Sequence, residues 1–137
     1  MNSGLLKFLE DEKLDPSFVI GGIHQKLKIN GKCGSGEFFI AEADESDGSF
    51  LKTAYFGAIV TNLENEHLDY WKTPELLNNA FQKFMSQNGI LFWCGDDERL
   101  QQLCSKGISY GFSPNNELQI TKLEFFDFGI SFSIHWK

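Results

Sequence analysis

The sequence has little positive charge, few cysteines and no long hydrophobic run. Its 12 lysines and arginines are outnumbered by 19 aspartates and glutamates, which gives a net charge of −7 at pH 7. Because nucleic-acid binding depends on a basic surface that neutralises phosphates, this balance argues against a nucleic-acid-binding protein. No segment approaches the roughly 18 apolar residues of a membrane-spanning helix, and the first residues lack the basic and apolar regions of a signal peptide.

The three cysteines include no C-x-x-C pair. An odd number without paired spacing favours neither a disulfide framework nor a zinc site. Reduced thiols are typical of the cytoplasm, so we expect a soluble, cytoplasmic protein that contacts neither membrane nor nucleic acid. An acidic protein that handles anionic substrates must offset its own charge locally, and bound metal ions usually do this.

The order of apolar segments predicts an α/β fold. Helical spacing predicts helices that begin near residue 5, at Thr73-Pro74-Glu75 and at Asp96-Asp97. The first helix is expected to end at Asp15-Pro16, because the residue before a proline avoids the helical conformation. Leu76 is expected on the buried face of the second helix. Short apolar runs that are typical of buried strands occur at residues 18–20, 38–41, 58–60, 90–94 and 108–110.

The last stretch of the chain changes its period. Apolar and small residues alternate from residue 129 to residue 136, which predicts a half-buried strand that forms an antiparallel hairpin with residues 118–125. We therefore expect residues 1–137 to form a single α/β domain. Its sheet should be mostly parallel and flanked by helices, with the antiparallel hairpin at the C-terminal end.

Acidic residues crowd the segment that follows the predicted strand 38–41, namely Glu42, Asp44, Glu45 and Asp47. In a parallel sheet, the carboxyl ends of the strands open into the crevice where ligands bind. Crowded carboxylates repel one another unless a cation or backbone N–H groups compensate, and Mg²⁺ bound through carboxylates and phosphate oxygens would do so. A solvated acidic turn is the alternative that the spacing leaves open.

A second polar segment follows the predicted strand 58–60 and contains His67. His67 comes about one strand–loop–strand unit after Glu42 in the sequence. We therefore expect Glu42 and His67 at the same edge of one sheet, within roughly 10 Å of each other, where they could share a metal–phosphate cluster. Taken alone, a histidine in such a place is more often a surface or capping residue.

The stretches EADESDGSFL (residues 42–51) and TNLENEHLD (residues 61–69) resemble the two metal-site segments of the Mur ligase family. They are most similar to the members of that family that join L-alanine to UDP-N-acetylmuramate in peptidoglycan precursor synthesis. The resemblance spans nearly the whole chain. It continues through residues 18–22, Asn30, Gly34, residues 36–38, Asp96-Asp97 and Tyr110-Gly111.

The resemblance implies an ATP-dependent ligase whose small-molecule partners are UDP-N-acetylmuramate and L-alanine. The muramate carboxylate would be phosphorylated by ATP, and the amine of L-alanine would attack the acyl phosphate. By position in the family's segments, Glu42 would bind the Mg²⁺ that bridges the ATP phosphates, and His67 a second Mg²⁺ near the acyl phosphate. Asp44, Asn62 and Asp69 would support this metal–phosphate site.

The sequence also departs from the family pattern. Glu66 stands where the family usually has aspartate, and Tyr55 where it has proline. No G-x-x-x-x-G-K-[ST] nucleotide loop occurs, and the glycine-rich run 31–36 precedes a strand and is predicted to be a hairpin turn. The chain is therefore expected to be a partial central domain that is inactive alone. The nucleotide loop with its strand, the UDP-binding N-terminal domain and the C-terminal domain would be absent from it.

Two other interpretations stay open. A non-catalytic α/β binding or interaction module would keep the fold without the chemistry. Another amide ligase of the same superfamily, such as the folate polyglutamating enzyme, is disfavoured by the acidic string 42–51. If the strand that feeds the nucleotide loop is missing, the sheet should have a gap or an unpaired edge at strands 38–41 and 58–60. Either chains would self-associate through such an edge, or the N-terminal helix and a neighbouring strand would shift to cover it.

Overall fold

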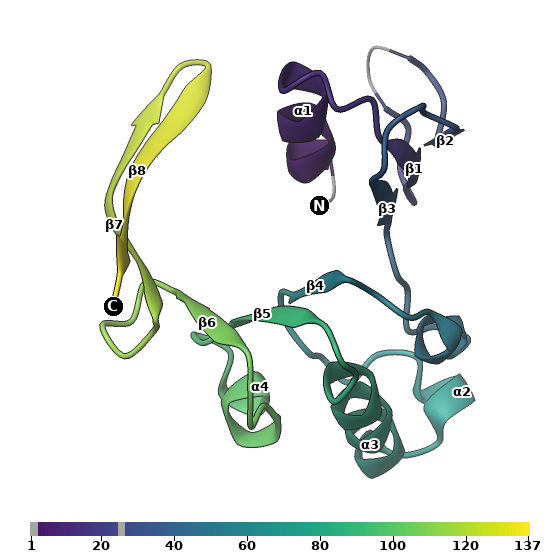
Figure 1. The fold of residues 1–137 in the computed structure, drawn as a ribbon. Helices are drawn as coiled ribbons and strands as arrows, with labels where there is room; N and C mark the ends of the chain where they lie inside the picture. The colour runs from purple at the N-terminus through teal and green to yellow at the C-terminus, as the bar shows by residue number, and fades with distance from the viewer. Residues whose placement is uncertain (1–2, 25–26) are drawn as a thin grey trace. The chain divides into compact units, whose positions relative to one another are not determined.

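The structure, a computed structural model, describes residues 3–24 and 27–137 and divides into two compact units between Asp44 and Glu45 (Figure 1). Each unit contains one sheet and its own apolar core. The first unit contains α1 (Ser3–Asp11), β1 (Ser17–Val19), β2 (Gly31–Lys32) and β3 (Phe39–Ala41). The second contains the 3-10 helix η1 (Ser49–Lys52), β4 (Gly57–Val60), α2 (Leu68–Trp71), α3 (Pro74–Met85), β5 (Ile90–Cys94), α4 (Glu98–Leu103), β6 (Ile108–Gly111), β7 (Leu118–Phe126) and β8 (Gly129–Trp136).

In the first unit, α1 ends earlier than predicted. Lys13 has a φ of 60°, and its N–H donates to the carbonyl of Glu10 while the N–H of Leu14 donates to that of Leu9. This pair of hydrogen bonds around a left-handed residue is a Schellman motif, which closes the helix at Asp11 before the proline is reached. The buried core of this unit consists of Leu6, Phe18, Ile20 and Ile40.

The prediction of a hairpin turn at residues 31–36 is wrong. β1 is antiparallel to β2 and parallel to β3, and it lies between them, so β2 and β3 are not paired with each other. The segment that joins them crosses against the residues before β1. A Cβ atom added to Gly34 would lie 2.1 Å from the carbonyl oxygen of Asp15, and one added to Gly36 would lie 1.8 Å from that of Leu14. The glycines are therefore needed for this close crossing rather than for a tight turn.

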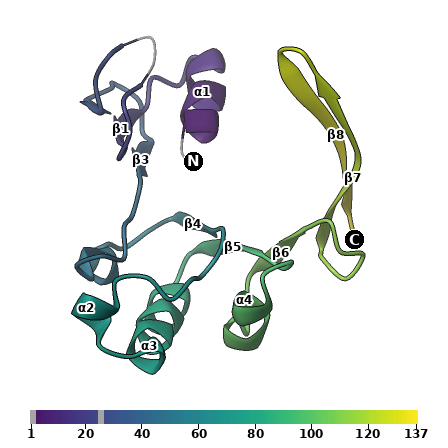
Figure 2. The same cartoon turned by 180° about the vertical axis from the view of Figure 1, so that it is seen from behind.

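The sheet of the second unit has the order β4-β5-β6-β7-β8. Its first four strands are parallel, and β8 is antiparallel to β7. Both α3 and α4 lie on one side of β4, β5 and β6 (Figures 1 and 2). Leu77 of α3 and Leu100 of α4 are fully buried there against Ala58, Val60 and Leu91. The predicted α/β fold with a mostly parallel sheet and a C-terminal hairpin is confirmed.

Two predictions of burial are wrong. Leu76 is 50% exposed, because the face of α3 that packs on the sheet is centred on Leu77 and Ala80. The alternating residues of β8 do not make a half-buried strand: Phe132 is 52% and Trp136 68% exposed. All eight residues of this strand are exposed. No helix among the described residues is long and apolar enough to cross a membrane.

β3 and β4 each lie at the edge of a sheet. Among the described residues, β3 pairs only with β1, and β4 pairs only with β5. β3 and β4 are therefore both edge strands, and the expected loss of a strand between them stays a prediction. Such edges are available for pairing with another chain, because the backbone groups on that side have no neighbouring strand.

We expect the amide hydrogens of β3 and β4 to exchange faster than those of β5, because β5 is hydrogen-bonded to a strand on each side. Hydrogen–deuterium exchange of the dilute chain, followed by NMR, measures this. β6 is the internal control, since it is also paired on both sides and should resemble β5. Uniformly strong protection of all four strands in a dilute monomer would contradict the prediction. Protection of β4 that rises with protein concentration would indicate self-association through its edge.

Candidate metal site

The candidate site lies in the second unit, where two segments approach α2. One is the acidic segment that begins at Glu45 and leads into η1. The other is the loop of residues 61–67, which joins the carboxyl end of β4 to α2. The strand ends at Val60, whose side chain is buried in the core, so the start of this loop is anchored by the sheet.

Trp71 of α2 fixes the acidic segment. Its Nε1–H donates to the backbone carbonyl of Glu45 at 2.8 Å. Gly48 has a φ of 70° and lies so close to α2 that an added Cβ would be 3.0 Å from the hydroxyl of Tyr70. The ring of the buried Phe50 stands edge-on to that of Trp71, with 6.2 Å between centroids. These contacts hold Glu45 beside the start of α2.

His67 occupies the residue before α2 in a left-handed conformation, with φ 53° and ψ 36°. This region is uncommon for residues other than glycine, although histidine tolerates it better than most. The carbonyl of His67 accepts hydrogen bonds from the N–H groups of Tyr70 and Trp71, both at 3.0 Å. The first turn of α2 therefore maintains a backbone conformation that is frequently found at functional positions.

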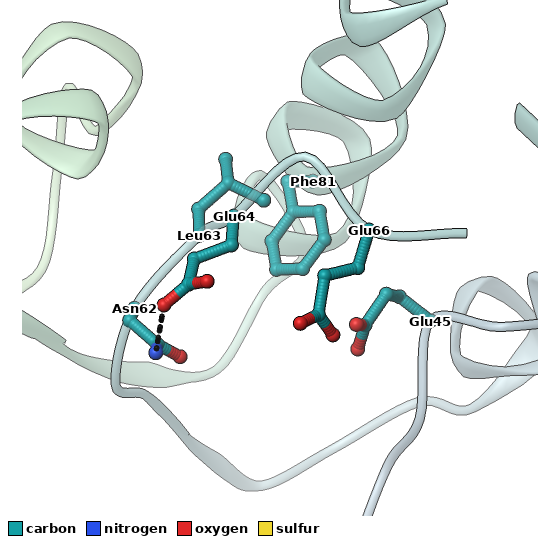
Figure 3. Close-up of a pocket in the computed structure, with 6 residues that line it drawn as sticks. All are labelled: Glu45, Asn62, Leu63, Glu64, Glu66 and Phe81. Carbon is teal, nitrogen blue, oxygen red and sulfur yellow. Dashed lines mark hydrogen bonds between the residues drawn. The ribbon is translucent and has the colours of Figure 1, made fainter. Parts of the chain in front are cut away.

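Glu45, Glu66 and His67 each place one potential ligand atom within 4.8 Å of the others. The Nε2 atom of His67 lies 3.7 Å from Oε1 of Glu45 and 4.0 Å from Oε2 of Glu66. The two carboxylates face each other in Figure 3. Two carboxylates and an imidazole can ligate a divalent cation, which would offset the repulsion between the acids. The donor set therefore fits the Mg²⁺ that the resemblance implies.

The cluster opens on a pocket of about 100 Å³ that is lined by Glu45, Asn62, Leu63, Glu64, Glu66 and Phe81 (Figure 3). The Nδ2 atom of Asn62 donates to Oε1 of Glu64 at 3.5 Å. A water molecule occupies about 30 Å³, so this volume accommodates an ion and a few waters. It is well below the roughly 300 Å³ at which pockets for drug-sized ligands begin. By its volume, this pocket suits a cation with its waters rather than a nucleotide.

The structure distributes the predicted site residues over both units. Glu42 directly follows β3 in the first unit, where its Oε2 atom accepts a hydrogen bond from the N–H of Gly21 at 2.8 Å. Asp44 is the last residue of that unit. Glu42 and His67 therefore belong to different units, and their expected proximity stays a prediction.

In the second unit, Asn62 lines the pocket and His67 belongs to the cluster, whereas Asp69 lies in the exposed first turn of α2. Glu45 and Glu66, which the structure brings beside His67, are not among the ligands assigned from the sequence. A signal was present, because Glu45 belongs to the acidic string and Glu66 directly precedes His67. No local pattern in the sequence, however, shows that the side chains of these two glutamates meet at His67.

Comparison with known proteins identifies related sequences and folds. The sequence matches the Mur ligase middle domain over residues 23–137. It is 42% identical over 137 residues to the UDP-N-acetylmuramate–L-alanine ligase of Protochlamydia amoebophila, which covers 97% of this chain and 30% of that protein. It is 39% identical over 119 residues to the enzyme of the same name from Carboxydothermus hydrogenoformans, with 82% of this chain and 26% of that protein covered.

Solved structures show the same fold. A UDP-N-acetylmuramate–alanine ligase from Thermotoga maritima matches with a TM-score of 0.77 at 20% identity and covers 89% of this chain and 28% of that one. The MurF ligase of Thermotoga maritima in complex with ADP matches with a TM-score of 0.69 at 14% identity, with 97% of this chain and 35% of that one covered. The chain spans less than a third of the length of the two curated relatives described above.

We expect Glu45→Gln and Glu66→Gln each to weaken the binding of Mn²⁺, a paramagnetic substitute for Mg²⁺, by at least about tenfold. The loss of a direct ligand should lower the metal affinity at least as much as the loss of an outer-shell partner does. Titration of the chain followed by electron paramagnetic resonance measures the affinity. Glu98→Gln is the matched control, because Glu98 is an exposed carboxylate in the first turn of α4. If Glu98→Gln weakened Mn²⁺ binding as much as Glu66→Gln does, the cluster would attract the cation only as nonspecific surface charge.

Proposed function

The chain belongs to the Mur ligase family, and on this premise we propose that it forms part of an ATP-dependent ligase that joins L-alanine to UDP-N-acetylmuramate in cytoplasmic peptidoglycan precursor synthesis. The observation that carries the proposal is the similarity, over nearly the whole chain, to relatives named for this reaction. The acidic string from Glu42 and the segment that contains His67 support it. They supply carboxylates and an imidazole of the kind that a metal-dependent transfer to an acid requires.

In the proposed reaction, the γ-phosphoryl group of ATP passes to the carboxylate of UDP-N-acetylmuramate, which releases ADP. The amine of L-alanine then attacks the acyl carbon, phosphate leaves, and the amine loses a proton as the amide forms. A bound Mg²⁺ would neutralise charge on the phosphoryl group. The protein's part is to hold the anionic groups in place without adding to their repulsion.

We assign Glu42 and His67 as Mg²⁺ ligands. Glu45 and Glu66 add two carboxylates at 3.7 and 4.0 Å from the imidazole of His67, so His67 does not act alone. The left-handed backbone at His67 and the hydrogen bond from Trp71 to Glu45 limit the movement of these ligands before a cation arrives. In this proposal Asp44, Asn62 and Asp69 support the site from outside the ligand set.

A nucleotide needs a phosphate cradle that these residues do not supply. The sequence contains no G-x-x-x-x-G-K-[ST] run, and the glycine-rich segment 31–36 crosses against the residues before β1 instead of opening a helix. We therefore propose that residues 1–137 represent part of a middle domain. The nucleotide loop, the UDP-binding domain and the C-terminal domain of the proposed ligase would lie outside them.

The 137 residues alone are expected to release no phosphate from ATP and to form no UDP-N-acetylmuramoyl-L-alanine, because nothing replaces the backbone cradle and lysine of a nucleotide loop. A steady-state phosphate-release assay and chromatographic detection of the product check this. Glu42→Ala serves as the control for contaminating ATPase. Phosphate release by the chain that disappears in Glu42→Ala would contradict the prediction.

A chimeric ligase tests the proposed function itself. If residues 1–137 replace the matching segment of the Protochlamydia amoebophila relative, we expect the chimera to form UDP-N-acetylmuramoyl-L-alanine. Glu42→Ala and His67→Ala in the chimera should each lower the rate by about 100-fold or more, since even outer-shell changes at metal sites cost 10- to 100-fold. Glu98→Gln should leave the rate unchanged.

Two outcomes would contradict the proposal. One is full activity in both the Glu42→Ala and His67→Ala chimeras, which would remove these residues from the metal site. The other is a folded chimera that binds its substrates but forms no product. That result would favour a non-catalytic module that retains the fold of the middle domain.

A further inference from the structure

Two adjacent aspartates after β5 hold the loops that follow both neighbouring strands. β5 lies between β4 and β6 in the sheet, and Asp96 and Asp97 come directly after it on the way to α4. The carboxylate of Asp96 accepts from the N–H groups of Phe112, at 2.5 Å, and Ser113, at 3.0 Å, in the loop after β6. The carboxylate of Asp97 accepts from the N–H of Leu63, at 3.2 Å, in the loop after β4.

The two oxygens of Asp97 have different partners. Oδ1 caps α4 by accepting from the N–H groups of Arg99, at 3.0 Å, and Leu100, at 2.8 Å. Oδ2 accepts from the N–H of Leu63. Capping alone would account for only one of these oxygens, and asparagine would serve that role equally well. The second oxygen links α4 to the loop that carries Glu66 and His67.

Arg99, the single arginine of the sequence, holds the same loop from its other side. Its Nη1 atom donates to the carbonyl of Leu63 at 3.3 Å, and its Nη2 atom donates to Oδ1 of Asn78 on α3 at 2.5 Å. Both polar backbone groups of Leu63 are therefore bound, the N–H by Asp97 and the carbonyl by Arg99. The side chain of Leu63 is itself buried in the apolar core.

These contacts constrain the short segment between Leu63 and the candidate ligands. Leu63 precedes Glu66 and His67 in the same loop, and His67 begins α2. A loop held at Leu63 and again at the first turn of α2 has little freedom between the two points. We propose that Asp97 and Arg99 are positioning residues that fix this loop so that Glu66 and His67 meet Glu45 at the candidate cation site.

The proposal rests on the cation site of the proposed function, and two variants isolate the positioning role. Asp97→Asn keeps an oxygen for the α4 cap but presents an NH₂ group to the N–H of Leu63, where no hydrogen bond can form. Arg99→Met keeps the apolar stem and removes both guanidinium donors. Asp96→Asn is the matched control, because it makes the same chemical change one residue earlier and affects the loop after β6 instead.

Three measurements on the 137-residue chain test the positioning role. They are amide exchange by NMR, the imidazole chemical shifts of His67, and Mn²⁺ affinity by electron paramagnetic resonance. Asp97→Asn and Arg99→Met should each speed exchange of the Leu63 amide hydrogen by about 10- to 100-fold, since a hydrogen bond to a charged group is lost. Each should weaken Mn²⁺ binding by about 10- to 100-fold. Asp96→Asn should change neither property, and thermal unfolding of all variants checks that the core is intact.

Unchanged exchange of the Leu63 amide hydrogen in Asp97→Asn and Arg99→Met would overturn the proposal. A loosened loop that keeps the wild-type affinity for Mn²⁺ would overturn it as well. If the wild-type chain binds no Mn²⁺, the cation site of the proposed function fails. The positioning role is then decided by His67, whose imidazole shifts should move in Asp97→Asn and Arg99→Met but not in Asp96→Asn.

Discussion

The parallel alignment of β4, β5 and β6 is the constraint on which the second unit depends. Strands that run in the same direction end at the same edge of the sheet, so the loops that follow them are gathered there. The connections between such strands must return across one face, and α3 and α4 do so over a core that includes Leu77, Leu91 and Leu100. Burial of these leucines supports the alignment, and the alignment brings the polar loops together.

Loops gathered at one edge still need partners for their backbone groups, and side chains supply them. Asp96 and Asp97 bind N–H groups on either side of β5, while Arg99 and Trp71 donate to loop carbonyls. Burial acts to raise the pKa of Asp96, but hydrogen bonds from the N–H groups of Phe112 and Ser113 and from the amide of Asn116 hold it below its ordinary value. This carboxylate therefore stays ionised at neutral pH and keeps its loop in place.

Local sequence predicted the parts of the fold that depend on local chemistry. The hydroxyl of Thr73 and the carboxylate of Asp97 accept from the first N–H groups of α3 and α4, as short polar residues before a helix do. The role of the glycines at 34 and 36 could not be predicted in the same way. Both a hairpin turn and a close crossing require glycine, and only the order β2-β1-β3 shows which one occurs. Alternation likewise predicted that β8 is a strand, but its burial depends on neighbours that alternation does not specify.

The sequence by itself determined the family, the α/β class and the two polar segments that carry Glu42 and His67, because these follow from residue type and order. Only the tertiary structure decided that Glu45 and Glu66 accompany His67. Their convergence depends on a hydrogen bond from Trp71 to Glu45 and on the left-handed turn at His67. It also decided that Asp97 and Arg99 act on Leu63, since residues far apart in the chain meet there only after β4 and β5 have paired. Such contacts are set by packing between elements, which no local pattern of residues encodes.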